Sequence, residues 1–541
     1  MSSTPAPSLA SASPSMSHRR VMEALSGLLL AMFVAILSST VVSAALPRII
    51  GDLGGGQSSY TWVVTATLLA MTVSTPIWGK LADLFDRKAL LQSGLVIFLV
   101  GSILAGFAHS TGWLIACRAV QGVGVGALTA LVQVILADLV SARERGRYMG
   151  YLGAVFGVGT IVGPVVGGVL TDGLGWRWCF FVGVPFGLAA LVLLQRTLDL
   201  PTRRREGAHI DVLGATLLAG GVSLLLIWVS LAGKSFAWWG PETIAMIGGA
   251  VVLLLALVAV ERRVAEPMLP MDLFADRTVT LAVVGSVAIG IAMFGTTVFL
   301  TQYMQLARGY SPTASGLLTI PMVVGLFASS TLAGRRIAKT GHYRRLMLGG
   351  AVLVTLGLGL MGLIDERTSL VEMGAFMVVL GAGIGMLQQN LVLAVQNAIP
   401  PSQLGAGSGL IAFFRSLGGA AGVSVLGAVL GSRVTTLVGE GLAARGIDPS
   451  AIPGGGSQIP DLDALPATVR PVIEHAYGAG VAELFLLALP LGVVAFLAIW
   501  LMREQPLGTK SGIEQAVEDA AGEQGRAIAA RPAAATAVGE A

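Results

Sequence analysis

The stretch GYLGAVFGVGTIVGPVVGGVLT, residues 150–171, decides the fold of this chain. It is long enough to cross a bilayer, and Gly159, Gly163 and Gly167 recur at every fourth residue, with Pro164 inside the run. In water such a helix would be unstable, because each interior Gly costs up to ~1 kcal/mol relative to Ala and Pro costs more. In lipid, glycines spaced four apart let a neighbouring helix approach closely. The stretch therefore predicts a membrane helix that packs tightly against another.

The composition predicts a polytopic membrane protein. Of the 541 residues 54% are hydrophobic and only 12% are charged, whereas soluble domains have roughly 25% charged residues. A nucleic-acid partner is not expected. The two cysteines, Cys117 and Cys179, are too few for a disulfide framework or a metal site and are interpreted as small apolar residues. The residues around Lys510 imitate the end of a phosphate loop but lack its first glycine, so no enzyme activity and no cofactor is expected.

A helix needs ~20 apolar residues to span a bilayer, and fourteen apolar runs of the chain qualify. They cover residues 25–46, 60–80, 90–108, 113–137, 148–171, 179–195, 212–231, 243–260, 279–303, 313–333, 346–364, 371–396, 405–430 and 479–501. Polar tails, residues 1–21 and 502–541, flank them; the first is expected to be disordered, and the second is expected to be cytoplasmic. A large outer loop is predicted at 431–478, where it would cover part of the outer opening.

The distribution of Lys and Arg predicts the orientation of the spans. With the N-terminus inside, 24 of the 34 basic residues lie in inner segments, eight lie in outer segments, and Arg118 and Arg415 lie within spans. This bias predicts that both termini are cytoplasmic and that the protein is a multi-pass protein of the cell membrane.

Two similar basic loops indicate an internal duplication. GKLADLFDRK, residues 79–88, follows the second span, and GRRIAKTGHYRR, residues 334–345, follows the tenth. Asp83 in the first loop is expected to bind either the start of the next helix or a basic side chain. Loops that recur at matching places predict two six-helix bundles. Their expected bounds are 22–200 and 266–501, joined by a linker with two extra helices at 201–265.

Three segments carry a family resemblance. Residues 79–90 resemble the loop signature between the second and third helices of the major facilitator superfamily, LIACRAVQGVGVG at 114–126 is similar to its fourth-helix signature, and 157–168 is similar to the fifth-helix signature of its proton-coupled exporters. The fourteen spans and LSSTVVSAALP at 37–47 resemble the fourteen-spanner drug:proton antiporter group. The chain departs from that group at three positions, with Ser38 where an acid is common and Ser43 and Gly183 where Asn is usual.

The resemblance implies an all-α major facilitator fold, an integral membrane protein whose cavity between the bundles opens alternately to each side. It implies efflux of amphipathic or cationic drugs and toxic compounds by a secondary active transporter, driven by the proton gradient and working as a monomer. The alternatives are a dedicated exporter of one endogenous product such as an antibiotic or lipid, a nutrient or ion symporter, and a receptor that transports nothing. Because Ser38 replaces the usual acid, the sequence leaves the identity of the proton carrier open.

Charged residues in or beside the spans are the first functional candidates, because a charge in a membrane is expensive. Arg118 is interpreted as an anion ligand, a partner of Ser38–Thr40, a charge that controls a neighbouring carboxyl, or a structural hydrogen-bond hub. Arg415 is interpreted either as a residue of proton coupling or gating, or as a structural bridge between helices. Glu483 is either a titrating group or a snorkelling side chain. Asp138 is expected to form a gating salt bridge with the basic loop.

Uncharged polar and aromatic residues of the spans are candidates for the lining of a substrate cavity. Hydrogen bonding or packing between helices is the alternative role for each of them. They are Ser38, Thr40, Trp62, Gln121, Gln302, Tyr303, Gln388, Gln389 and Asn390.

Overall fold

The computed structural model describes residues 18–55, 57–200, 210–232, 236–264, 266–447, 466, 468–510 and 514, and all structural statements concern these residues. Their regular structure is helical apart from one isolated bridge between Ala232 and Phe236. Fourteen of the described helical segments are long and apolar enough to cross a membrane. This confirms both the all-α fold and the number of spans that the sequence predicts.

The helices occur in three groups along the chain. The first group comprises α1 His18–Asp52, α2 Gln57–Leu84, α3 Arg87–Gly106, α4 Thr111–Leu139, α5 Ala142–Gly173, α6 Trp178–Phe181 and α7 Gly183–Thr197. The linker contributes α8 Val212–Leu231 and α9 Pro241–Glu261. The last group comprises η1 Met271–Ala275, α10 Arg277–Gln302, η2 Tyr303–Ala307, α11 Pro312–Leu318, α12 Ile320–Thr340, α13 Arg344–Met361, α14 Leu370–Ala398, η3 Pro401–Gln403, α15 Leu404–Ala443 and α16 Arg470–Leu501.

Polar side chains fix where many of these helices begin. Asp86 accepts a hydrogen bond from the Ala89 amide at the start of α3, and Ser110 caps α4 in the same way. Ser369 and Glu372 form a reciprocal capping box at the start of α14. Such caps satisfy backbone N–H groups that have no partner within the helix, so they end each span at a defined residue near the polar ends of the molecule.

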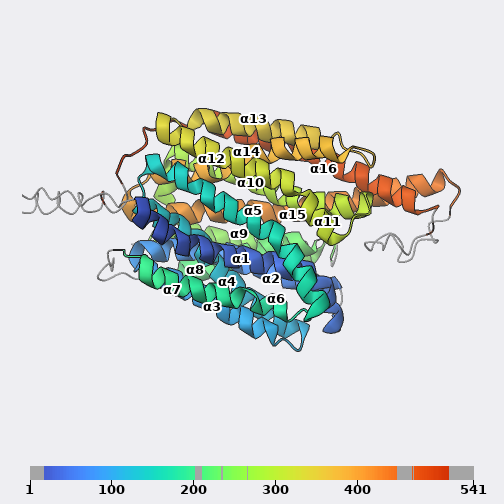
Figure 1. Ribbon diagram of the computed structural model, residues 1–541, viewed down its shortest axis with the longest axis horizontal. Helices are drawn as coiled ribbons and strands as arrows, with labels where there is room; N and C mark the ends of the chain where they lie inside the picture. Colours follow the sequence, from blue (N-terminus) through green and yellow to red (C-terminus); the bar gives the residue numbers. More distant parts are fainter. Residues whose placement is uncertain are drawn as a thin grey trace, which may run out of the picture.

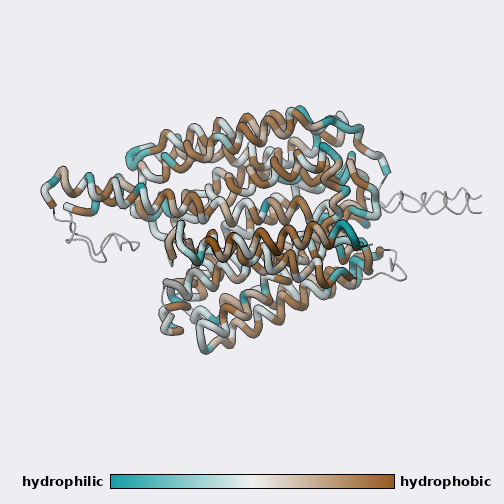
Figure 2. Tube along the Cα trace, turned by 180° about the vertical axis from the view of Figure 1, so that it is seen from behind, coloured by the Kyte–Doolittle hydropathy of each residue, from teal (hydrophilic) through white to brown (hydrophobic). Residues whose placement is uncertain are grey.

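The two halves of the chain lie side by side. In Figure 1 the blue to green helices α1–α4, α6 and α7 occupy one long side and α12–α14 and α16 the other, with α5 and α15 between them. Buried apolar side chains form two clusters within residues 21–200, whereas a larger third cluster draws mostly on residues after 210. Hydrophobic residues dominate the middle of the helices, and hydrophilic residues gather toward the two ends (Figure 2). We call these ends inner and outer, following the distribution of Lys and Arg.

The predicted outer loop at 431–478 is wrong in its bounds. Helix α15 continues to Ala443 and α16 begins at Arg470, and the two project beyond the other helices in Figure 1. The physical reason is an apolar stripe at every fourth residue, Val434, Val438 and Leu442, which is buried and keeps the helix packed beyond the membrane-length run. Residues 448–465 and 467 lie outside the described residues, so the expected cover of the outer opening stays a prediction.

Candidate functional site

Helix α5 packs against α1 through the glycines that the sequence singles out. A Cβ on Gly159 would lie 2.7 Å from Ile36 Cγ2, and one on Gly163 would overlap the Thr40 hydroxyl. Thr40 Oγ1 donates a hydrogen bond of 3.0 Å to the Gly159 carbonyl, so the backbones are close enough to be bridged by one hydroxyl. The predicted close contact is confirmed at these two glycines. It places Thr40 in the α1–α5 contact instead of the substrate cavity for which it was a candidate.

Other residues of α5 join this helix to the other half of the molecule. A Cβ on Gly150 would lie 3.2 Å from the Thr331 Cα of α12, and one on Gly157 would overlap Val323 of the same helix. Pro164 approaches α11, since a Cβ on Gly316 would lie 3.4 Å from its Cγ. Helix α5 is therefore held between α1 of its own half and α11–α12 of the other half. Gly167 is buried, and its carbonyl accepts a hydrogen bond from Thr171.

A second contact between the halves lies at the inner ends of α2 and α15. Asp83 accepts hydrogen bonds of 2.8 Å from the backbone N–H groups of both Gly405 and Ala406, the first turn of α15. A carboxylate at a helix N-terminus is favoured by the unpaired N–H groups and by the helix dipole. The sequence predicts that Asp83 binds the next helix or a basic side chain. The first alternative is wrong, because Asp86 caps α3 and Asp83 instead caps a helix 322 residues further along the chain.

The predicted salt bridge of Asp138 with the basic loop is confirmed. Arg87 bonds the Asp138 carboxylate and lies 3.4 Å from Asp83, and all three side chains are 5% exposed or less. Arg87 thereby connects the cap of α15 to the inner end of α4. A buried charge of this kind requires partners, since an unpaired one would be strongly destabilising.

Further polar contacts that sequence reasoning missed cross the same inner end. Arg145 of α5 bonds the Gln396 side chain of α14, and the Gln396 amide in turn donates to the Ser408 hydroxyl at 2.7 Å. Arg143 donates to the carbonyls of Ala338 and Lys339 at the end of α12. The available sequence signal was only a cluster of inner arginines, which positive-inside topology explains equally well.

Residues 503–510, which we call the C-terminal strap, run across this end. Glu504 accepts hydrogen bonds from the Tyr343 and Arg344 amides, and Asn397 bonds the strap on either side of Leu507. The Gly508 carbonyl accepts from the Arg143 amide of α5 at 3.3 Å. Burial raises the pKa of the Tyr343 phenol, which therefore stays a neutral hydroxyl and accepts the Gln505 amide. The strap joins α13 and α14 of one half to α5 of the other.

The polar centre of the first half differs from the predicted one. Arg118 is 5% exposed and donates to Gln121 Oε1 at 3.0 Å, while its Nε atom has no partner in the described structure. Ser38 is 1% exposed and its hydroxyl is also unpartnered. The predicted partnership of Arg118 with Ser38 or Thr40 does not appear among the described hydrogen bonds. Ser38 lies instead against Gly183, whose Cβ would be 2.6 Å from Ser38 Oγ.

The second half carries a matching polar centre. Arg415 is 7% exposed and its Nη1 lies 3.5 Å from the Gln388 carbonyl of α14, so the predicted structural bridge is present. Gln388, Gln389 and Asn390 are all buried. The side-chain amide oxygen of Gln389, Oε1, has no partner in the part of the chain that is described.

Three further residues were candidates for the lining of a substrate cavity, namely Tyr303, Gln302 and Trp62. Tyr303 is fully buried and donates to the Asp365 carbonyl at 2.5 Å, so it fastens an outer loop instead of lining a cavity. Gln302 and Trp62 are half-buried.

Carboxyl groups are unevenly distributed over the membrane thickness. The buried carboxyl side chains of the described residues are Asp83, Asp138, Asp211 and Glu261, and each lies at the inner end of a helix. Glu483 is half-exposed and forms a two-point ion pair with Arg433, with distances of 2.6 and 2.8 Å. The interior of the described spans therefore holds two buried arginines and no buried carboxyl group.

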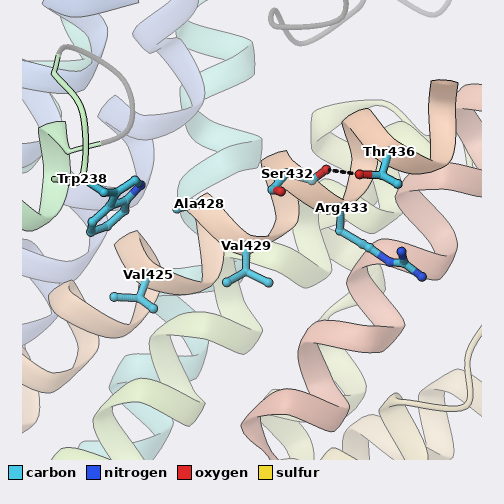
Figure 3. Close-up of a pocket in the computed structure, with 7 residues that line it drawn as sticks. All are labelled: Trp238, Val425, Ala428, Val429, Ser432, Arg433 and Thr436. Carbon is cyan, nitrogen blue, oxygen red and sulfur yellow. Dashed lines mark hydrogen bonds between the residues drawn. The ribbon is translucent and has the colours of Figure 1, made fainter.

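A cavity of about 500 Å³ lies beside the outer half of α15. Figure 3 shows Trp238 of the linker facing α15, while Arg433 points away from it toward α16. The remaining lining residues are small or apolar, namely Val425, Ala428, Val429, Ser432 and Thr436. Sequence reasoning missed this contact, because nothing in the chain marks Trp238 as a neighbour of α15.

Three curated relatives align with most of this chain. An uncharacterised MFS-type transporter of Mycobacterium tuberculosis is 36% identical over 89% of this chain and 69% of its own length. The multidrug transporter protein MdtP of Bacillus subtilis is 34% identical, with 82% of this chain and 78% of that protein covered. An acurin A biosynthesis cluster MFS-type transporter of Aspergillus aculeatus is 30% identical, with 90% of each chain covered.

The solved structures and the family profile agree with these relatives. The proton:xylose symporter XylE has the same fold, with a TM-score of 0.59 at 15% identity over 92% of this chain and 99% of that chain. The sequence profile of the Major Facilitator Superfamily matches residues 28–423. Because this profile covers most of the chain and the relatives align over four fifths of it or more, the protein belongs to the Major Facilitator Superfamily.

Proposed function

We propose that this transporter exports small amphipathic compounds across the cell membrane by proton-coupled antiport, as a monomer with both termini in the cytoplasm. The observation that carries the proposal is the Asp83 cap on α15, a charged contact between the two halves at the inner end. A contact of this kind can hold the inner side closed and can be released when its carboxylate is neutralised. The relative named a multidrug transporter supports drug-like compounds as the substrates.

The proton-binding groups of this proposal are the inner carboxyl groups. Asp83 and Asp138 share Arg87, so a proton on either carboxyl would weaken the network that ties α15 to α2 and α4. Glu483 is the candidate on the outer side, where a proton would have to displace Arg433. The first-helix position offers no carboxyl, because it is Ser38.

A dedicated exporter of one endogenous product is the second candidate function. It is favoured by the relative that is named a transporter of a biosynthesis cluster and by the departure from the antiporter group at Ser38. Import of a nutrient or ion is disfavoured by the resemblance of residues 157–168 to the exporters' fifth helix.

Two measurements test the proposal. Purified protein in liposomes with an acidic lumen should accumulate amphipathic dyes in the lumen and release protons to the outside, and collapse of the pH gradient should stop accumulation. A deletion strain should become more susceptible to several unrelated biocides if the protein is a multidrug exporter, and to none if it exports one endogenous product. Dye movement that ignores the pH gradient would reject proton coupling while leaving export intact.

A further inference from the structure

Among the described residues, two positive charges are buried in the membrane interior, one in each half of the molecule. Arg118 is the eighth residue of α4, about 10 Å along the helix from its outer end, and Arg415 is the twelfth residue of α15, about 16 Å from its inner end. A hydrocarbon core is ~30 Å thick, so both side chains belong to its interior. Neither position can be explained as a snorkelling side chain at an interface.

Neither arginine has a counter-charge within the described structure. The hydrogen-bond partners are neutral, the Gln121 amide oxygen for Arg118 and the Gln388 carbonyl for Arg415. Each guanidinium carries five N–H donors, and Arg118 Nε is buried without an acceptor. A buried cation is normally paired or neutralised, because desolvation disfavours its charge.

A further unpartnered donor lies next to Arg118. Gln121, which binds Arg118 through its oxygen, leaves its Nε2 donor buried and unpartnered. This adds a second unfilled donor from the same two side chains. Donors without acceptors, at a positive charge, are the complement of an oxyanion.

From this arrangement we infer that the exported compounds carry an oxyanion, such as a carboxylate or a sulfonate, which Arg118 and Arg415 bind during transport. The planar guanidinium matches a carboxylate or sulfonate with two parallel hydrogen bonds. The inference rests on the proposed export function and names its substrate class. It also replaces the cationic substrates of the sequence-based expectation, since two uncompensated buried cations repel a permanent cation.

An anionic substrate also changes the energetics of export. An inside-negative potential of 100 mV by itself supports about a fifty-fold outward gradient of a monovalent anion. Export of an anion therefore needs less help from protons than export of a cation, which must leave against that potential. The absence of an acid at Ser38 is consistent with this smaller demand on proton coupling.

Two dyes that share one ring system and differ only in a sulfonate group test whether transport depends on the oxyanion. Anilinonaphthalene sulfonate is an anion, phenylnaphthylamine is its parent without the sulfonate, and ethidium serves as the cation. The full-length protein in liposomes should transport the sulfonate, with a kcat/KM for it that falls roughly tenfold or more in Arg118→Gln and in Arg415→Gln. For phenylnaphthylamine, kcat/KM should change less than about threefold. Arg48→Gln, which removes an exposed arginine at the outer end of α1, should leave the kcat/KM of both dyes unchanged.

A wild-type measurement covers the case in which the arginine variants do not fold. A potassium diffusion potential, negative on the side from which export starts, should accelerate sulfonate export several-fold. A sulfonate rate that ignores the potential overturns the inference, as do equal losses of both naphthalene dyes in the two variants. Export of ethidium and phenylnaphthylamine without the sulfonate overturns it and leaves the proposed export standing. If none of the three dyes moves, the proposed export function fails and the inference fails with it.

Discussion

The Asp83 carboxylate accepts a hydrogen bond from the Gly405 amide, 322 positions further along the chain, with 2.8 Å between Asp83 Oδ1 and the Gly405 nitrogen. The same carboxylate reaches the next amide, that of Ala406. A Cβ on Gly405 would lie 2.7 Å from the Asp83 oxygen, so the approach requires glycine. One side chain of the first half thus occupies the N-terminus of a helix in the second.

Asp83→Asn should weaken the closed inner end. The amide keeps one acceptor oxygen but loses the charge, and we expect a loss of about 1–2 kcal/mol from the closed state, because charge-assisted bonds exceed neutral ones by roughly that amount. Spin labels on the inner ends of α3 and α13 should report longer distances in a larger fraction of molecules. Asp86→Asn is the matched control, since Asp86 caps α3 within its own half. An unchanged distance distribution would exclude Asp83 as a gate.

Gly163→Leu should stop export while the protein still inserts and folds. The new side chain overlaps Thr40 and separates α5 from α1. Dye efflux normalised to membrane abundance measures the effect. Gly173→Leu on the same helix is the control, because a Cβ there meets nothing within 4 Å. Normal efflux in Gly163→Leu would show that this contact does not have to persist or re-form during transport.

Asp138→Asn should destabilise the fold by about 3–5 kcal/mol, because it leaves Arg87 buried without its main counter-charge. Thermal unfolding in detergent measures the loss. The double variant Arg87→Met with Asp138→Leu should recover much of the stability, since it removes both charges. A double variant no more stable than Asp138→Asn would show that the pair itself, and not the uncompensated charge, carries the stability.

Glu504→Gln should loosen the C-terminal strap without unfolding the protein. Its carboxylate accepts the two amides that open α13, and loss of the charge at a helix N-terminus costs ~0.3–1 kcal/mol. Hydrogen exchange of residues 503–510 should become several-fold faster. Glu372→Gln, at the start of α14 and far from the strap in sequence, is the control. Exchange that stays at the wild-type rate would mean that the bonds of Asn397, Arg143 and Tyr343 are enough to hold the strap.

Glu483→Gln and Arg433→Gln should separate the two roles left open for Glu483. The pair is half-exposed, so as an ion pair it contributes little to stability and either variant should export nearly normally. If Glu483 carries a proton, only Glu483→Gln should fail to export against a gradient while it still exchanges substrate. Measurements of uphill export and of exchange in the same liposomes distinguish the outcomes.

The sequence by itself determined the fold class and the number of spans, because both follow from local properties. A span is a run of apolar residues matched to the bilayer thickness, and the four-residue glycine spacing of residues 150–171 requires a close neighbour. The salt bridge of Asp138 with the basic loop was also predictable, since helices α2 to α4 follow one another directly. The family resemblance of residues 79–90 and 157–168 pointed to the same architecture.

Only the tertiary structure decided which distant groups meet. Asp83 has a local option, the start of α3, but Asp86 takes that place and Asp83 caps α15. Arg118 and Ser38 lie at similar predicted depths, yet Ser38 faces Gly183 and Arg118 bonds Gln121. Depth along a helix can be read from sequence, whereas the direction in which a side chain points depends on how each helix is rotated against its neighbours. That rotation is set by packing over the whole molecule, and so only the three-dimensional structure shows that no described residue supplies a counter-charge to the two buried arginines.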